Sequence, residues 1–214
     1  MKNKKKAIVC VSNDLVTDNR VARTCLVLEG QNYDVFLVGR EKKNSPLMSQ
    51  KSFRWKRLKL PFEKGPLFYI ALNLRLLLFL FSNKFDLIYA NDLDTLIPCF
   101  VAAKIKNSKL IYDTHELFTE VPELTSRPRV QKIWLKIESA IFPKLKHVIT
   151  VNDSIAQIYS QKYRIPITAI RNVPEYHKLE TDLKTREQFK LSNDDFILII
   201  QGSGLNIDRG VEEA

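Results

Sequence analysis

The sequence lacks the short motifs that would assign a function directly. Its first apolar run, residues 7–11, leads into Ser12, Asn13, Asp14 and Leu15 rather than into a G-x-G-x-x-G loop, which argues against an NAD-dependent oxidoreductase. There is also no Walker phosphate-binding loop and no G-x-S-x-G nucleophile elbow. Function must therefore be inferred from the order of strands and helices and from the residues between them.

Cysteine is scarce, with three residues in 214. Cys10, Cys25 and Cys99 lie in apolar periodic segments, and neither a C-x-x-C nor a Cys/His pattern accompanies them, so we expect no metal site and no disulfide framework. We expect buried thiols in a reducing compartment. A signal-peptide core is also absent, because the apolar run 7–11 is too short. These absences together predict a cytoplasmic protein.

Positive charge is abundant but unevenly distributed. Residues 1–172 hold 29 Lys and Arg against 15 Asp and Glu, whereas residues 173–214 hold 5 against 9. The first part thus carries +14 and the second −4, within a total of +10. The excess indicates an anionic partner (a phosphorylated ligand, a lipid headgroup surface or nucleic acid) or a lysine-rich solvated surface.

Short apolar runs alternate with helical patterns along the first 170 residues. We predict strands at residues 7–11, 33–38, 51–60, 86–90, 109–112, 147–151 and 168–170, with 51–60 near an edge. We predict helices at residues 18–29, 66–82, 93–106, 128–142 and 153–163. This alternation predicts an α/β fold with a Rossmann-like parallel sheet and helices on both faces.

Polar residues follow five of the predicted strands. In parallel α/β sheets ligands bind beyond the carboxyl ends of the strands, so these residues predict the wall of a cleft. The alternative is that they cap the following helices, which we favour for Asn152 and Asp153. The residues assigned to substrate binding are Asn13, Asp14, Arg20, Asn91, Asp92, Asp113 and Glu116.

One segment, residues 67–81, is apolar nearly all round and is interrupted only by Asn73 and Arg75. It is short for a membrane span, which needs about 20 apolar residues. We expect a helix packed between the sheet and a neighbour. The alternative is a helix whose outer face enters a membrane interface, aided by the basic residues between 51 and 59.

A composition change near residue 173 predicts the domain organisation. Residues 1–172 form the first domain, 173–194 read as a linker, and 195–214 as the truncated start of a second domain. There the apolar residues 196–200 predict a strand. Gly202 and Gly204 follow in a loop that ends at Arg209 and Gly210 with the start of a helix.

The ordered set of motifs resembles the family 4 retaining glycosyltransferases of bacteria. The resemblance covers nearly the whole chain through residues 12–21, 28–30, 35–40, 86–92, 112–116, 148–152, 171–174 and 201–210. It implies half of a GT-B fold, in which two Rossmann-like domains face each other across a cleft. The N-terminal domain would hold the acceptor and the C-terminal domain the nucleotide sugar.

The resemblance also implies roles for individual residues. His115 matches a histidine at the cleft and is the candidate catalytic residue, with a pKa suited to proton handling. Gly202, Gly204, Arg209 and Gly210 match the donor phosphate-binding loop, where backbone N–H groups and a cation would stabilise the departing diphosphate. No carboxylate pair indicates a covalent glycosidase route.

These features predict a retaining glycosyltransferase that moves a sugar from a nucleotide diphosphate sugar to a saccharide or lipid-linked acceptor, for cell-surface polysaccharide. The family's E-x7-E element does not occur in this chain, so we expect the chain to be inactive alone. No metal and no cofactor are predicted. Alternatives are a non-catalytic glycan- or membrane-surface-binding module and a sugar-nucleotide epimerase of GT-B architecture. We expect peripheral contact with an anionic membrane at its inner face and no nucleic-acid partner.

Overall fold

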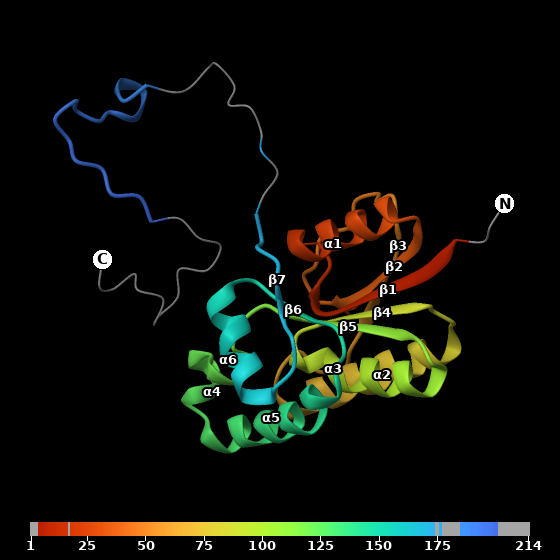
Figure 1. Ribbon diagram of the computed structural model, residues 1–214. Coiled ribbons are helices and arrows are strands. Elements are labelled where there is room, and N and C mark those ends of the chain that lie inside the picture. Colours follow the sequence, from red (N-terminus) through yellow and green to blue (C-terminus); the bar gives the residue numbers. More distant parts are fainter. Residues whose placement is uncertain (1–3, 17, 174–175, 177–184, 201–214) are drawn as a thin grey trace. The chain divides into compact units, whose positions relative to one another are not determined.

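Seven parallel strands form one sheet in the order β3-β2-β1-β4-β5-β6-β7 (Figure 1). The computed structural model describes residues 4–16, 18–173, 176 and 185–200. The strands are β1 (Lys5–Asp14), β2 (Tyr33–Glu41), β3 (Arg54–Lys59), β4 (Leu87–Asn91), β5 (Lys109–Thr114), β6 (Val148–Thr150) and β7 (Thr168–Ala169). The predicted α/β parallel sheet is confirmed, and all of its pairings are parallel.

The helices lie between the strands, as the alternating pattern predicts. They are α1 (Asn19–Gly30), α2 (Gly65–Ser82), α3 (Leu93–Lys106), α4 (Pro122–Thr125), α5 (Pro128–Ile141) and α6 (Asp153–Tyr163). Short 3-10 turns cover Phe118–Glu120, Phe142–Lys144 and Glu187–Phe189. Helix α2 begins with Pro66 in its first turn, where the missing N–H costs nothing.

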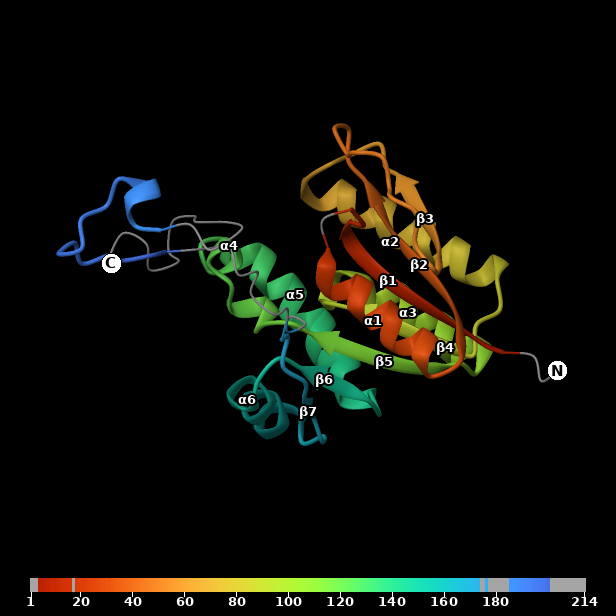
Figure 2. The same ribbon diagram turned by 90° about the horizontal axis from the view of Figure 1, so that it is seen from above.

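Two apolar cores lie on opposite faces of the sheet. Successive side chains of a strand point to opposite faces, so Ala7, Val9 and Val11 of β1 pack with α1, while Ile8 and Cys10 pack on the other side. That second core is the larger and includes buried residues of α2, α3, α5 and α6. Helices therefore cover both faces, with α1 in front of the strands in Figure 2 and α2 and α3 behind them.

Strand β1 is longer than the sequence pattern indicates. The strand was expected to end at Val11, but it continues to Asp14, with an irregular register against β2 between Cys10 and Asp14. The two strands approach closely here: a Cβ on Gly39 would lie 2.5 Å from Leu15 Cδ2 and 2.8 Å from the Asn13 carbonyl oxygen. A larger residue at position 39 would force the backbone at Asn13 to move, so glycine permits this close approach of the two segments.

Helix capping by Asn152 is confirmed. Its Oδ1 accepts a hydrogen bond from the Ile155 backbone N at 2.8 Å and so satisfies one of the free donors of α6. Asp18 does the same for α1, accepting from Val21 N at 3.1 Å. These side chains are therefore engaged with the backbone.

The segment after residue 172 differs from the expectation. The chain divides into two compact units, residues 1–172 and 173–214. Residues 196–200 were predicted as a strand, but none of them is in a strand and all are exposed. A strand requires a partner for its backbone groups, and no described residue pairs with this segment. The predicted loop and helix start at residues 201–210 lie outside the described residues, as do parts of the predicted linker.

Candidate functional site

An Arg20–Asp113 ion pair forms the centre of the polar cluster at the carboxyl ends of β4 and β5. Arg20 Nη2, from the first turn of α1, donates to Asp113 Oδ1 at 2.7 Å. Tyr89 OH, from β4, donates to Asp113 Oδ2 at 2.7 Å. The Asp113 side chain is only 2% exposed. Burial alone would raise its pKa, but the His115, Arg20 and Tyr89 contacts outweigh burial and lower the pKa of Asp113, so this carboxylate is ionised.

His115 lies beside this carboxylate, at the end of β5. Its Nδ1 is 3.3 Å from Asp113 Oδ1 and 3.8 Å from Asp92 Oδ1. Burial would lower the pKa of His115, but the contact with Asp113 and the negative charges of Asp92 and Asp113 reverse this and raise the pKa above its usual value. The imidazole therefore has a larger protonated fraction at neutral pH than a free histidine.

Asp92 adopts a backbone conformation that is unusual for a residue with a side chain. It has φ 59° and ψ 167° between β4 and α3. A non-glycine residue in such a region costs about 1–3 kcal/mol and is retained only where its surroundings hold it. Asp92 N donates to Asp113 O at 2.9 Å, and Asp92 Oδ1 accepts from His115 N at 3.2 Å. Burial raises the pKa of Asp92 to about 6.

Two further residues of the carboxyl edge, Asp94 and Arg40, were missed as site residues by the sequence analysis. Asp94 is buried in the first turn of α3, and its Oδ1 has no hydrogen-bond partner. Burial and then the charge of Asp92 raise the pKa of Asp94 to about 7, against the opposing effects of Ser12 and Arg40. The buried Nε of Arg40, at the end of β2, also lacks a partner. The sequence signal that could have identified Asp94 is an acid at the start of an otherwise apolar helix.

Two predicted substrate-binding residues point into the protein. Asn91 is fully buried, and its Nδ2 donates to the Cys10 carbonyl oxygen of β1 at 2.9 Å, while its Oδ1 has no partner. Asp14 is also buried, and its two carboxylate oxygens accept from Val16 N at 3.1 Å and from Lys42 N at 3.3 Å. Both side chains hold neighbouring backbone segments in place.

The remaining predicted residues lie at the rim of the edge or outside the described chain. Asn13 and Glu116 are exposed. The Glu116 carbonyl oxygen accepts from Thr114 Oγ1 at 2.8 Å. Gly202, Gly204, Arg209 and Gly210 lie outside the described residues, so the donor phosphate-binding role remains a prediction.

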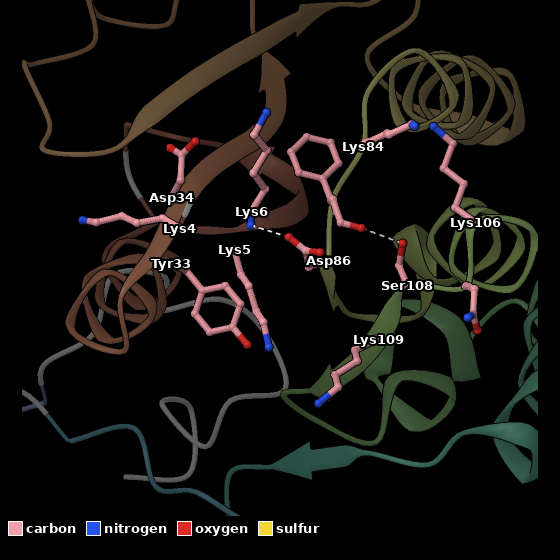
Figure 3. Close-up of a pocket in the computed structure, with 12 residues that line it drawn as sticks. Lys4, Lys5, Lys6, Tyr33, Asp34, Lys84, Asp86, Lys106, Ser108 and Lys109 are labelled. Carbon is pink, nitrogen blue, oxygen red and sulfur yellow. Dashed lines mark hydrogen bonds between the residues drawn. The ribbon is translucent and has the colours of Figure 1, made fainter. Parts of the chain in front are cut away.

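A separate hollow of about 1020 Å³ lies at the opposite, amino edge of the sheet (Figure 3). Six lysines line it: Lys4, Lys5, Lys6, Lys84, Lys106 and Lys109. The polar cluster is not part of it. We place the candidate site at the carboxyl edge, because the buried, mutually bonded ionisable groups are there and parallel sheets bind ligands at that edge. The described residues include no group of three His, Cys, Asp or Glu arranged to hold a metal ion.

The cluster can bind a polar, hydroxylated ligand and exchange a proton with it. His115 supplies a hydrogen-bond donor whose charge depends on pH near neutrality, and Asp113 and Arg20 fix its surroundings. Asp92 and Asp94 add carboxyl groups with pKa values of about 6 and about 7. Such groups change protonation state near pH 7, as acid–base chemistry requires.

Two solved structures share the fold of this chain. Sucrose-phosphate synthase from Thermosynechococcus elongatus aligns with a TM-score of 0.62 and 16% identity over 89% of this chain and 54% of that chain. UGT2 from Phytolacca americana, solved with UDP-2-fluoro-glucose and pterostilbene, aligns with a TM-score of 0.55 and 10% identity over 83% of this chain and 56% of that chain. At such identities the likeness concerns the fold, and this chain spans about half the length of both proteins.

Curated protein sequences give no match to the chain. The family model described as Glycosyltransferase Family 4 matches residues 17–174, which include the whole polar cluster and most of the sheet. The seven-stranded parallel sheet agrees with the N-terminal domain of GT-B glycosyltransferases. On this sequence match and this fold, the chain belongs to Glycosyltransferase Family 4.

Proposed function

We propose that this chain forms the acceptor side of a retaining glycosyltransferase whose donor is a nucleotide diphosphate sugar. The acceptor is a saccharide or lipid-linked saccharide for surface polysaccharide, and the reaction takes place at the cytoplasmic face of the membrane without a cofactor. The observation that carries the proposal is the cluster of Arg20, Asp113, His115 and Asp92 at the carboxyl edge of the sheet. The complex of UGT2 with UDP-2-fluoro-glucose supports the donor class by analogy of fold.

In this proposal His115 faces the reacting sugars. Glycosyl transfer breaks the bond between the sugar and the diphosphate, which leaves as an anion, and joins the sugar to the acceptor oxygen. The acceptor hydroxyl gives up its proton, which the neutral form of His115 can accept, and the sugar hydroxyls need fixed hydrogen-bond partners. The ionised Asp113 orients the imidazole through its contact with Nδ1, and Arg20 and Tyr89 hold Asp113 in turn. Nε2 of His115 then remains for the substrate.

The test uses the full-length gene product with a panel of nucleotide sugars and saccharide or lipid-linked acceptors. We expect His115→Ala to lower turnover by about 100-fold or more, the usual effect of removing a positioned acid–base group, without loss of folding. His147→Ala is the matched control, because His147 is exposed just before β6, away from the carboxyl edge. The turnover of this variant should equal that of the wild type.

The same assay separates the alternatives. Donor conversion that needs no acceptor would favour an epimerase, and glycan binding without donor consumption would favour a binding module. Equal turnover of His115→Ala and wild type would remove His115 from the site.

A further inference from the structure

Helix α2 carries apolar residues on two opposite faces. Phe68, Leu72, Leu76 and Leu80 are buried in the larger core against the sheet and α3. On the other side Leu67, Ile70, Leu74 and Leu78 are each more than half exposed, and Phe81 is 39% exposed. At about 100° per residue these five side chains fall within an arc of about 80°, opposite the buried face. We call these five residues the outer stripe.

The polar residues that interrupt α2 in the sequence lie off the outer stripe. Asn73 Nδ2 donates to the carbonyl oxygens of Tyr69 at 2.8 Å and Asp94 at 2.9 Å, so its side chain is directed toward α3. Arg75 Nη1 donates to the Lys59 carbonyl oxygen at the end of β3. One polar residue therefore lies on each flank of the helix, and the outer stripe is left without a polar side chain.

Cations border the outer stripe, and α2 itself contains no acidic residue. Lys64 precedes the helix and Lys84 follows it, at the rim of the lysine-lined hollow (Figure 3). The acids nearest the helix ends in sequence are Glu63 and Asp86, and each accepts a backbone hydrogen bond, from Lys43 N and Lys6 N.

The helix is long and apolar enough to cross a membrane by length and composition, yet 22% of its apolar window is buried within the protein. That buried face belongs to the core of the sheet, and Lys106 Nζ secures the end of α2 by donating to the carbonyl oxygens of Leu80, Phe81 and Asn83. A helix held in this way cannot leave the sheet without opening the core. It can instead lie along a membrane surface with the outer stripe facing the lipid.

We propose that the outer stripe of α2 docks this protein onto an anionic lipid bilayer, with the stripe in the headgroup region and the bordering cations against lipid phosphates. Apolar burial and electrostatic attraction act together in such docking. A second copy of the chain fits the surface less well. Two copies meeting symmetrically along α2 would bring Lys64, Arg75 and Lys84 of both chains together, and like charges oppose contact.

The test is flotation of the 214-residue chain with phosphatidylcholine vesicles that contain or lack phosphatidylglycerol. We expect flotation only with the anionic vesicles at about 0.05 M salt, and a loss of about fivefold or more at about 0.5 M salt, where charges are screened within about 4 Å. The double variant Leu74→Glu/Leu78→Glu should reduce the floated fraction by about tenfold.

The matched control is Leu26→Glu/Val27→Glu on α1. These side chains are 50% and 64% exposed and lie on the opposite face of the sheet, so flotation should be unchanged. Circular dichroism of both variants checks that they fold. If the Leu74→Glu/Leu78→Glu variant does not fold, Leu74→Ser/Leu78→Ser replaces it, and its floated fraction should fall by about threefold or more.

Failure to float on anionic vesicles at low salt would overturn the proposal. So would equal losses from the α1 and α2 variants, or a dimer of the chain, seen by light scattering, that the α2 variant dissociates while neither protein floats. The membrane proposal does not rest on glycosyl transfer. A chain that floats but belongs to an inactive enzyme would support docking alone, and an active enzyme that does not float would support glycosyl transfer alone.

Discussion

At the scale of single residues, Asp113 joins the parts of the candidate site. It accepts hydrogen bonds from Arg20 of α1 and Tyr89 of β4, and its Oδ1 lies 3.3 Å from Nδ1 of His115, which follows its own strand. The partners come from three parts of the chain, and Arg20 is 93 positions away in the sequence. A substitution at Asp113 therefore affects the protonation of its neighbours as well as their positions.

The first prediction concerns the protonation of His115. Burial lowers the pKa of His115 and the two carboxylates raise it, so Asp113→Asn should lower the pKa of His115. The measurement is a histidine NMR titration. Asp34→Asn, at an exposed ion pair with Arg54, serves as the control and should leave the His115 pKa unchanged. A His115 pKa that stays the same in Asp113→Asn would contradict the geometry.

The raised pKa of His115 also determines how this residue contributes to the stability of the protein as pH changes. Because the pKa of His115 is raised in the folded state, its contribution is fully present below about pH 6.5, the unfolded value, and is lost as pH rises through the folded pKa. The stability difference between wild type and His115→Gln should therefore be larger at about pH 5.5 than at about pH 8.

The second prediction uses the backbone of Asp92. Both Asp92→Gly and Asp92→Ala remove the carboxylate, but only glycine relieves the conformation at φ 59°. The glycine variant should be more stable than the alanine variant by about 1–3 kcal/mol, the reverse of the order at an ordinary position. Denaturant unfolding measures the difference. If alanine were the more stable of the two, the backbone at position 92 would not be strained.

At the scale of elements, α5 and α6 are joined by a buried carboxylate. Glu138 of α5 is fully buried and accepts from Lys162 Nζ at 2.7 Å, from Tyr159 OH at 3.4 Å and from Tyr163 OH. Burial and then the charge of Glu138 raise the pKa of the Tyr159 and Tyr163 hydroxyls, so both remain donors. This network holds α6 against α5.

The third prediction follows from that network. Glu138→Ala should lower the free energy of unfolding by about 3 kcal/mol, because it leaves a cation and two hydroxyls without their acceptor. The value lies at the lower end of the usual range since the Lys162 side chain is 40% exposed. Gln157→Ala, at an exposed position of α6, should change the stability by less than about 0.5 kcal/mol. Equal effects of the two substitutions would argue against the network.

The elements themselves were largely predictable from sequence. Parallel strands are buried on both faces, so runs such as residues 7–11 and 87–90 stand out as continuously apolar. The extension of β1 to Asp14 was not predictable, because Ser12 and Asn13 resemble a loop and the space for them depends on Gly39 of another strand. The strand at residues 196–200 was wrong, because an apolar run does not supply its own pairing partner.

The site was predictable only in part, because a sequence pattern does not show which distant residue a side chain will contact. The polar residues at the strand ends included Asp113 and His115, and the expectation that Arg20 faces the same edge agrees with its hydrogen bond to Asp113. The pattern did not distinguish a side chain that faces outward from one that bonds the backbone, as Asn91 and Asp14 do. Asp94 was missed because an acid in the first helical turn looks like a capping residue. Whether these groups bind substrate stays a prediction.

At the scale of the whole molecule, residues 1–172 contain a complete fold. Both apolar cores are built from residues between Ala7 and Ile167, and the sheet ends with β7. Arg23 Nη2 of α1 donates to Asn172 Oδ1 and so ties the end of this unit to its beginning.

The fourth prediction is that residues 1–172 fold without the remainder. Their free energy of unfolding should lie within about 0.5 kcal/mol of that of the same unit in the 214-residue chain, because no core residue is removed. Denaturant unfolding followed by Trp134, which lies in the larger core, compares the two proteins. A loss of more than about 2 kcal/mol would mean that residues 173–214 complete the core.

The charges of β3 have a consequence for how copies of the protein avoid aggregation. This strand forms one border of the sheet, and Arg54, Lys56, Arg57 and Lys59 occupy four of its six positions. A border strand offers unpaired peptide groups to any other chain, and a row of like charges repels an identical strand that approaches them. Polymerisation through this border is therefore disfavoured, and the short two-residue strand at the other border offers little backbone for a foreign strand to extend.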